Sequence, residues 1–137
     1  MHRSIAVLLL IGAVAVTGCR AEPIYNPTDI AYAPAVTTTQ SLSRADYKNA
    51  IIRAGTERGW TFQDAGPGHL VGNLAVRGKH FATVDVFYDT ESFTINYRDS
   101  QNLDYDPATG AIHSNYNSWV TNLQQDIQAE VARLETS

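Results

Sequence analysis

The fold is decided by Tyr116-Asn-Ser-Trp-Val-Thr-Asn-Leu-Gln-Gln-Asp-Ile-Gln-Ala-Glu-Val-Ala-Arg-Leu134, close to the end of the 137-residue chain. The apolar residues of this stretch recur at steps of three and four, which places their side chains on one face of a helix. They are Tyr116, Val120, Leu123, Ile127, Val131 and Leu134, with Trp119 beside them. Ser114 or Asn115 is suited to cap the start. The pattern predicts a long amphipathic helix from 114 or 115 to about 134.

A second helix is predicted earlier in the chain, from Leu42 to Arg58. Ser43 is the expected N-cap, and Asp46, three residues later, takes the place of the Glu or Gln of a capping box. Gly59 is suited to end the helix, because glycine readily adopts the left-handed conformation of a helix terminus. The apolar stripe of this helix is narrow: Tyr47, Ala50, Ile51 and Ala54.

Four short segments between the two helices have the apolar patterns of β-strands. They are Trp60–Phe62, Leu70–Val76, Phe81–Tyr88 and Phe93–Tyr97. Turn-forming residues at 78–79 and 89–92 connect the last three as hairpins. Short hairpins produce antiparallel pairing, and the helices need an apolar face to cover. We therefore predict an α+β fold, a two-layer sandwich in which a four-stranded antiparallel sheet carries the N-terminal and the C-terminal helix on one face.

The length of the loop after Val76 decides which face of the middle strands is buried. A loop of two residues would turn Asp85 toward the face of Leu70 and Leu74. A loop of three residues, Arg77–Lys79, exposes Asp85 and keeps the aliphatic set together. We therefore expect the three-residue loop.

The segment between the last strand and the C-terminal helix carries two patterns. Asp106-Pro-Ala-Thr-Gly110 suits a turn closed by glycine, so 103–105 and 111–113 are expected to form a small hairpin. Asn102, Asp104 and Asp106 also alternate like the first ligands of an EF-hand calcium loop. Pro107 replaces the required glycine, however, and His113 replaces the required Glu. We predict a polar turn and no metal site.

The N-terminus has the three parts of an export signal. His2 and Arg3 precede the apolar run Ile5–Val16, whose length of about 18 Å is too short for the ~30 Å hydrocarbon core of a membrane. The run ends in Val16-Thr17-Gly18-Cys19, which resembles the lipobox of bacterial lipoproteins. The resemblance implies cleavage before Cys19, and a covalent diacylglycerol and an N-acyl chain on that cysteine as its membrane anchor. The alternative is an ordinary signal peptide that leaves a free thiol.

The chain is predicted to divide into three parts. Residues 1–18 are the lipoprotein signal peptide, 19–40 are the lipidated cysteine and a flexible tether, and 41–137 are the α+β domain. The tether carries Pro23, Pro27 and Pro34 and shows no helical or strand period. It could extend to about 70 Å as a disordered spacer. The alternative is a segment that orders on a partner, with four apolar anchors: Ile24, Tyr25, Ile30 and Tyr32.

Composition narrows the possible partners. After removal of residues 1–18 the chain keeps nine Lys and Arg against fourteen Asp and Glu. This acidic balance argues against nucleic-acid binding and against a polybasic membrane patch. Cys19 is the only cysteine, so no disulfide forms within the chain. Arg20 stands where enterobacterial lipoproteins retained in the inner membrane have aspartate, so the resemblance implies the outer membrane, with the domain facing the periplasm.

The sequence lacks the motifs of a catalytic centre. It has no nucleophile elbow and no Gly-rich phosphate loop, and its histidines lack the spacing of metal ligands. Two carboxylate pairs are better explained as solvated surface groups: Asp99 with Asp104, and Asp85 with Glu91. We therefore predict that the protein is not an enzyme and needs no catalytic cofactor.

The densest cluster of polar and aromatic residues lies at the end of the last strand and the start of the C-terminal helix. Its members are Tyr97, Arg98, Asp99, Asn102, Tyr105, Tyr116 and Trp119. Tyr, Trp and Arg concentrate binding energy at interfaces, so this patch is the candidate recognition surface. The alternative is structural: Arg98 pairs with Asp99, and the aromatic rings pack the loop onto the helix.

A family resemblance rests on this patch. Tyr97-x-x-Ser100-x-x-Leu103-x-Tyr105, followed by Tyr116-Asn-x-Trp119 and preceded by Arg58-Gly-Trp60, resembles small uncharacterised lipoproteins of Gram-negative bacteria. It extends over residues 43–135 and implies a location and a fold, but no activity.

Together these features predict a lipid-anchored, non-enzymatic periplasmic module that binds or helps to assemble another envelope component. The alternative function is binding of a small ligand or a cell-wall glycan in a cleft between the sheet and the loop 103–113. An enzyme that uses Asp99 or His113 is the third possibility.

Overall fold

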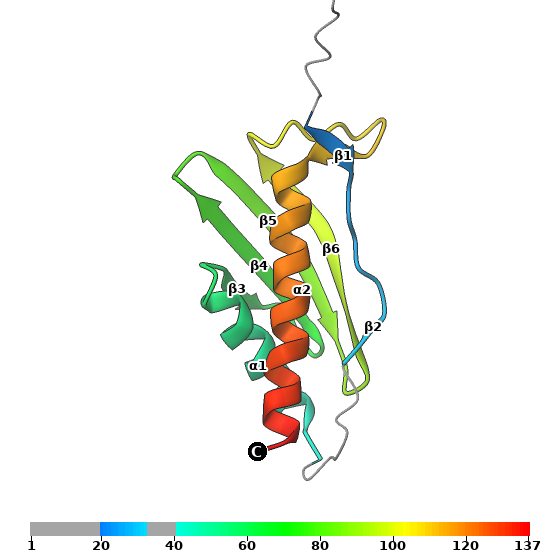
Figure 1. The fold of residues 1–137 in the computed structure, drawn as a ribbon, viewed down its shortest axis with the longest axis vertical. Coiled ribbons are helices and arrows are strands. Elements are labelled where there is room, and N and C mark those ends of the chain that lie inside the picture. Colours follow the sequence, from blue (N-terminus) through cyan, green and yellow to red (C-terminus); the bar gives the residue numbers. More distant parts are fainter. Residues whose placement is uncertain (1–19, 33–40) are drawn as a thin grey trace, which may run out of the picture.

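The computed structural model describes residues 20–32 and 41–137 as two helices and two antiparallel sheets (Figure 1). The predicted signal peptide and Cys19 lie outside these residues. The helices are α1, Arg44–Thr56, and α2, Ser114–Glu135. The strands are β1 (Ala21–Pro23), β2 (Ile30–Ala31), β3 (Thr61–Asp64), β4 (His69–Val76), β5 (His80–Tyr88), β6 (Ser92–Gln101) and β7 (Ala111–His113). The predicted α+β class is confirmed.

The main sheet has five strands in the order β2-β6-β5-β4-β3, so the prediction of four strands is wrong by one. The additional strand, β2, pairs with only two residues at the start of β6. β1 and β7 form a separate two-stranded sheet. Both helices lie over the same face of the main sheet, and the opposite face carries no helix (Figure 1).

The three-residue loop between β4 and β5 is confirmed. Val76 pairs with His80, and Leu70 pairs with Val86. Arg77 and Gly78 both have positive φ, which closes the loop. The side chains that face the helices along these strands are buried, whereas Asp85 lies on the opposite face.

A shift in the β5–β6 pairing falls between Thr83 and Val84. Val84 pairs with Tyr97 and Thr83 pairs with Asp99, which leaves Arg98 as the extra residue of a β-bulge. The bulge therefore changes which residues of the second half of β6 face the helices.

The core lies between the sheet and the helices. The apolar stripe of α2 that the sequence predicts is fully buried at five positions: Tyr116, Val120, Leu123, Ile127 and Val131. α1 begins with the predicted capping box of Ser43 and Asp46, and its predicted apolar residues are buried. The cap of α2 differs from the prediction, because His113 accepts the Asn115 N–H through Nδ1 at 3.1 Å.

Residues 20–32, here called the N-terminal strap, correct the prediction of a flexible tether for that part of 19–40; Cys19 and residues 33–40 lie outside the described residues. β1 pairs with β7, and the Ser114 N–H donates to the carbonyl of Arg20 at 2.7 Å. The strap then runs beside α2 to the edge of the main sheet (Figure 1), where Tyr32 is buried against Tyr47 and Phe93. Its pairings are too short to produce a period in the sequence, which explains the error.

The predicted hairpin of 103–105 with 111–113 is formed in part. The Asp106 N–H donates to the Ala111 carbonyl, the Gly110 N–H to the Asp106 carbonyl and the His113 N–H to the Leu103 carbonyl. The other edge of β7 pairs with β1, a strand far away in the sequence that local patterns do not predict. Among the described residues, no helix is long and apolar enough to cross a membrane.

Candidate functional site

The aromatic part of the predicted recognition patch is a packed cluster. The ring centroid of Tyr97 lies 4.3 Å from that of Tyr105 and 5.6 Å from that of Tyr116. The Tyr97 hydroxyl is hydrogen-bonded to Ser100 Oγ at 2.8 Å. Tyr116 is fully buried, so it cannot touch a partner while the fold is intact. These rings fix the loop 102–110 to α2, as the structural alternative predicted, and only Tyr105 is exposed.

The polar members of the patch are separated from the rings. Arg98 donates from Nη1 to Asp85 Oδ1 at 2.9 Å rather than pairing with Asp99. The alternation of β6 places Arg98, like Asn96, on the helix-free face of the sheet, where Asp85 also lies. Asp99 accepts the backbone N–H of Ser100. Asn102, which has a positive φ, donates from Nδ2 to the Lys79 carbonyl at 2.6 Å. The predicted patch is therefore not one continuous surface.

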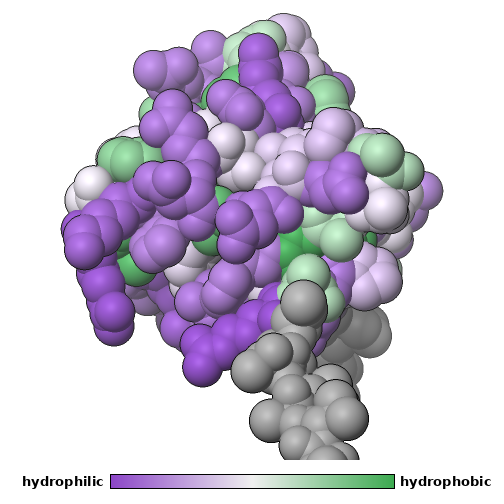
Figure 2. All heavy atoms as spheres, turned by 90° about the horizontal axis from the view of Figure 1, so that it is seen from above, coloured by the Kyte–Doolittle hydropathy of each residue, from purple (hydrophilic) through white to green (hydrophobic). Residues whose placement is uncertain are grey.

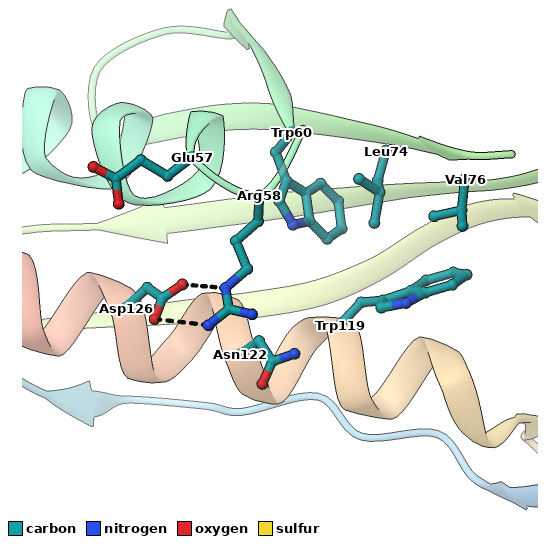
Figure 3. Close-up of a pocket in the computed structure, with 8 residues that line it drawn as sticks. All are labelled: Glu57, Arg58, Trp60, Leu74, Val76, Trp119, Asn122 and Asp126. Carbon is teal, nitrogen blue, oxygen red and sulfur yellow. Dashed lines mark hydrogen bonds and ion pairs between the residues drawn. The ribbon is translucent and has the colours of Figure 1, made fainter.

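Trp119 is the one patch residue that lines a cavity between the two helices and the main sheet. This cavity, here called the groove, has a volume of about 580 Å³. It lies between the end of α1, strand β4 and helix α2 (Figure 3). Its lining residues are Glu57, Arg58, Trp60, Leu74, Val76, Trp119, Asn122 and Asp126.

The groove has an aromatic and aliphatic part and a charged part. The half-buried indole of Trp119 lies opposite Leu74 and Val76, and the almost fully buried Trp60 lies beside Leu74 (Figure 3). Arg58 reaches from the end of α1 toward α2 and donates from Nε to Asp126 Oδ2 at 2.5 Å. Its second bond, from Nη2 to Oδ1, is 3.4 Å long. This arrangement suits a ligand with an apolar or planar group beside a polar one.

The ion pair of Arg58 and Asp126 forms the charged end of the groove. Hydrogen bonding to the Asp126 carboxylate raises the pKa of the Arg58 guanidinium, so this side chain is always charged. Both side chains are partly exposed to water, which weakens the contribution of the pair to stability. A ligand that carries either charge can therefore compete for one member of the pair at small cost.

The turn that follows α1 positions Arg58 and Trp60. The Trp60 N–H donates to the Gly55 carbonyl at 3.0 Å, and Gly59 has a φ of 91°, which favours glycine. Gly55 itself is buried, and a Cβ there would lie 2.4 Å from the ring of Phe62. The motif Arg58-Gly-Trp60 thus sends its two side chains to the groove from one tight turn.

The helix-free face of the sheet carries a second cluster that the sequence analysis did not identify. His69 Nε2 lies 2.7 Å from Asp85 Oδ1, the same atom that accepts from Arg98. The His69 ring stacks on Phe87 at 4.4 Å. His69 and Asp85 are 16 residues apart and come together only through the β4–β5 register, so neither local spacing nor composition indicates the cluster.

The residues of the predicted polar turn do not form a ligand set. Asp106 Oδ1 accepts the Ala108 N–H at 2.9 Å, and Asp104 has a positive φ and is exposed. Within residues 20–32 and 41–137, no group of three or more His, Cys, Asp or Glu side chains is arranged to hold a metal ion.

Comparison with protein-family models, with curated proteins and with solved structures gives no significant match.

Proposed function

We propose that this protein is a lipid-anchored, non-enzymatic binding module of the bacterial periplasm, which holds another envelope protein in the groove. The anchor is Cys19, and the outer membrane is the proposed location. The single observation that supports binding is the groove itself, in which a half-buried Trp119 stands beside an apolar strand and a partly exposed ion pair.

The chemistry of the groove defines what a partner must offer. Trp60, Leu74 and Val76 provide an apolar floor, and Trp119 provides one wall. Tryptophan and arginine dominate the energy of many interfaces because they combine a large contact area with a polar handle. An apolar or aromatic side chain of the partner would pack against this floor. A neighbouring charged group of the partner would bind Arg58 or Asp126 in place of the other member of the pair.

Site-specific crosslinking in intact cells tests this proposal. A photoreactive amino acid at Asn122, in the groove, should give one crosslinked envelope protein, whereas the same amino acid at Thr83, on the helix-free face, should not. Trp119→Ala should remove the product, with the circular dichroism spectrum unchanged. Equal products from both positions, or none from Asn122, contradict the proposed surface.

The anchor is tested separately. Mass spectrometry of the mature N-terminus should find a diacylglycerol thioether and an N-acyl chain on Cys19, and Cys19→Ser should release the protein from membranes. An unmodified Cys19 thiol would exclude the lipid anchor, but it would not contradict binding of a partner in the groove.

A small ligand or cell-wall glycan is the second candidate, and the size of the groove favours it. Ligand sites commonly have volumes of roughly 300–1,000 Å³, and the groove falls in this range. The volume supports the groove as the candidate site over the predicted cleft beside the loop 103–113, where the neighbouring hollow has a volume of about 270 Å³. A ligand-dependent rise in Tm with cell-wall fragments, lost in Trp119→Ala, would favour this function over protein binding.

A further inference from the structure

The end of the molecule that carries β1 is connected to Cys19 without a spacer. Arg20 follows Cys19 directly, and its carbonyl already accepts the N–H of Ser114 at 2.7 Å. β1 begins at Ala21 and pairs with β7 over all of its three residues. Consecutive Cα atoms are about 3.8 Å apart, so a lipid on Cys19 is attached within about one residue of the folded domain.

This end is fixed relative to the rest of the fold. β1, β7 and the loop 102–110 lie together at one end of the long axis, and the C-terminus lies at the other (Figure 1). α2 runs between them, and its first residue is the one that binds Arg20. Asn117 Nδ2 also donates to the Pro23 carbonyl at 2.9 Å, and the Ile24 N–H donates to the Gly110 carbonyl at 2.9 Å.

The same end is hydrophilic. Figure 2, which views the molecule from this side, shows mainly polar residues. The exposed side chains include three carboxylates beside one arginine: Glu22, Asp104 and Asp106 with Arg20. Tyr105 is the large apolar side chain exposed on this end, and a single aromatic ring is too small to hold the domain in a membrane. The carboxylates leave no excess of cations on β1 and the loop 102–110 to attract anionic lipids. Its position at a membrane would therefore come from the covalent link alone.

We propose that the end formed by β1, β7 and the loop 102–110 faces the headgroups of the membrane that holds the chain, with α2 directed away from that membrane. This rests on the proposed anchor at Cys19. This orientation also sets the distance of the groove from the membrane, because Trp119 and Asp126 lie five and twelve residues along α2 from Ser114. At 1.5 Å per residue, the groove opens roughly 8–18 Å from this end, within reach of a membrane-proximal segment of a partner.

The test compares two exposed alanines at different heights in the full, acylated chain. Cys19 is the only cysteine and is blocked by the lipid, so Ala108→Cys, in the loop 102–110, and Ala129→Cys, on α2, can each be labelled alone with a small fluorophore. In vesicles of phosphatidylethanolamine and phosphatidylglycerol that contain headgroup-nitroxide lipids, quenching at position 108 should exceed that at 129 by roughly threefold. Equal quenching, or stronger quenching at 129, overturns the proposal.

A spacer variant distinguishes two reasons why this end could lie near the membrane: the short covalent link to the lipid, or an affinity of the end itself for lipid. Insertion of about 20 Gly and Ser residues between Cys19 and Arg20 allows roughly 25 Å of separation and should reduce quenching at 108 to the level at 129. Quenching at 108 in the parent protein should be unchanged between low and high salt. Persistent quenching in the spacer variant, or loss of quenching with salt, contradicts the short-link explanation.

The orientation can be tested even if cells do not acylate Cys19. Coupling of a maleimide lipid to the Cys19 thiol of the chain that begins at this residue anchors it at the same position, with the fluorophore introduced at 108 or 129 through a photostable noncanonical amino acid. The same difference in quenching is expected. If cells do not acylate Cys19 but the quenching still differs between positions 108 and 129, the proposed anchor is excluded and the proposed orientation is kept. If the quenching does not differ, the proposed orientation is excluded.

Discussion

The N-terminal strap and helix α2 lie side by side, but different interactions hold them in place. Five side chains of α2 are fully buried, whereas the strap buries only Pro27 and Tyr32 and half-buries Ile24 and Ile30. The strap is held mainly by hydrogen bonds, including that of the Ile95 N–H to the Pro27 carbonyl at 2.9 Å. Burial of apolar area contributes more than a partly solvated hydrogen bond. We therefore expect α2 to carry the stability of the fold and the strap to open locally.

The largest effect is expected from Leu123→Ala in α2. Leu123 is fully buried, so the substitution removes apolar contacts and leaves a cavity, which should cost about 2–5 kcal/mol of unfolding free energy. Urea denaturation measures this cost. Gln125→Ala, an exposed position on the same helix, is the matched control and should change stability by less than ~0.5 kcal/mol. A similar cost for both would contradict the assignment of the core to this stripe.

A smaller and local effect is expected from Asn117→Ala, which separates the strap from α2. The Asn117 amide accepts the Tyr25 N–H and donates to the Pro23 carbonyl, both at 2.9 Å. Its removal should cost about 1–2 kcal/mol in the strap. Hydrogen exchange should show faster exchange at Tyr25 and Ile24, with protection in α2 unchanged. Unchanged exchange in the strap would mean that its other hydrogen bonds and the burial of Tyr32 hold it without the Asn117 amide.

Tyr116→Phe in α2 is expected to stabilise the protein by about 1 kcal/mol. The Tyr116 hydroxyl is buried and has no hydrogen-bond partner among the described residues, so its removal relieves a desolvation cost. Urea denaturation at neutral pH tests the gain. A loss of stability would show that the hydroxyl has a favourable partner, such as a bound water.

The same variant should also change the response of stability to alkaline pH. Burial raises the pKa of the Tyr116 phenol above its ordinary value of about 10. The folded state therefore holds this proton more tightly than the unfolded state, and the stability it contributes is complete below pH 10 and lost as pH rises above that value. In Tyr116→Phe, the unfolding free energy should therefore decrease less steeply with pH, as measured by denaturation curves from pH 9 upward. An unchanged slope would contradict the burial of this phenol.

The smallest effect is expected from Tyr25→Phe in the strap. The Tyr25 hydroxyl donates to Gln124 Oε1 at 2.6 Å, but both side chains are accessible to water, which replaces the lost bond. The change should be below ~0.5 kcal/mol in urea denaturation. A cost above that of Asn117→Ala would show that the strap is held by its side chains rather than by its backbone.

The sequence indicates only some residues of the candidate site. The density of polar and aromatic residues in the patch indicates Trp119 as a site residue, and the structure places it in the lining of the groove, half-buried. Arg58 and Trp60 were noted only as part of a resemblance. They meet Trp119 because the turn at Gly59 directs them across to α2, which requires two helices that are distant in the sequence. Tyr116 was assigned to the same surface, although its place in the stripe buries it completely.

Local chemistry alone determined the two helices, the capping box of α1, the length of the β4–β5 loop and the antiparallel order of the four central strands. Each of these depends on residues a few positions apart, whose side-chain period or turn geometry is legible along the chain. The strap, the pairing of β1 with β7, the contact of Arg98 with Asp85 and the groove were decided only by the tertiary structure. They arise where backbone groups or side chains tens of residues apart satisfy one another, and such pairing leaves no period in the sequence.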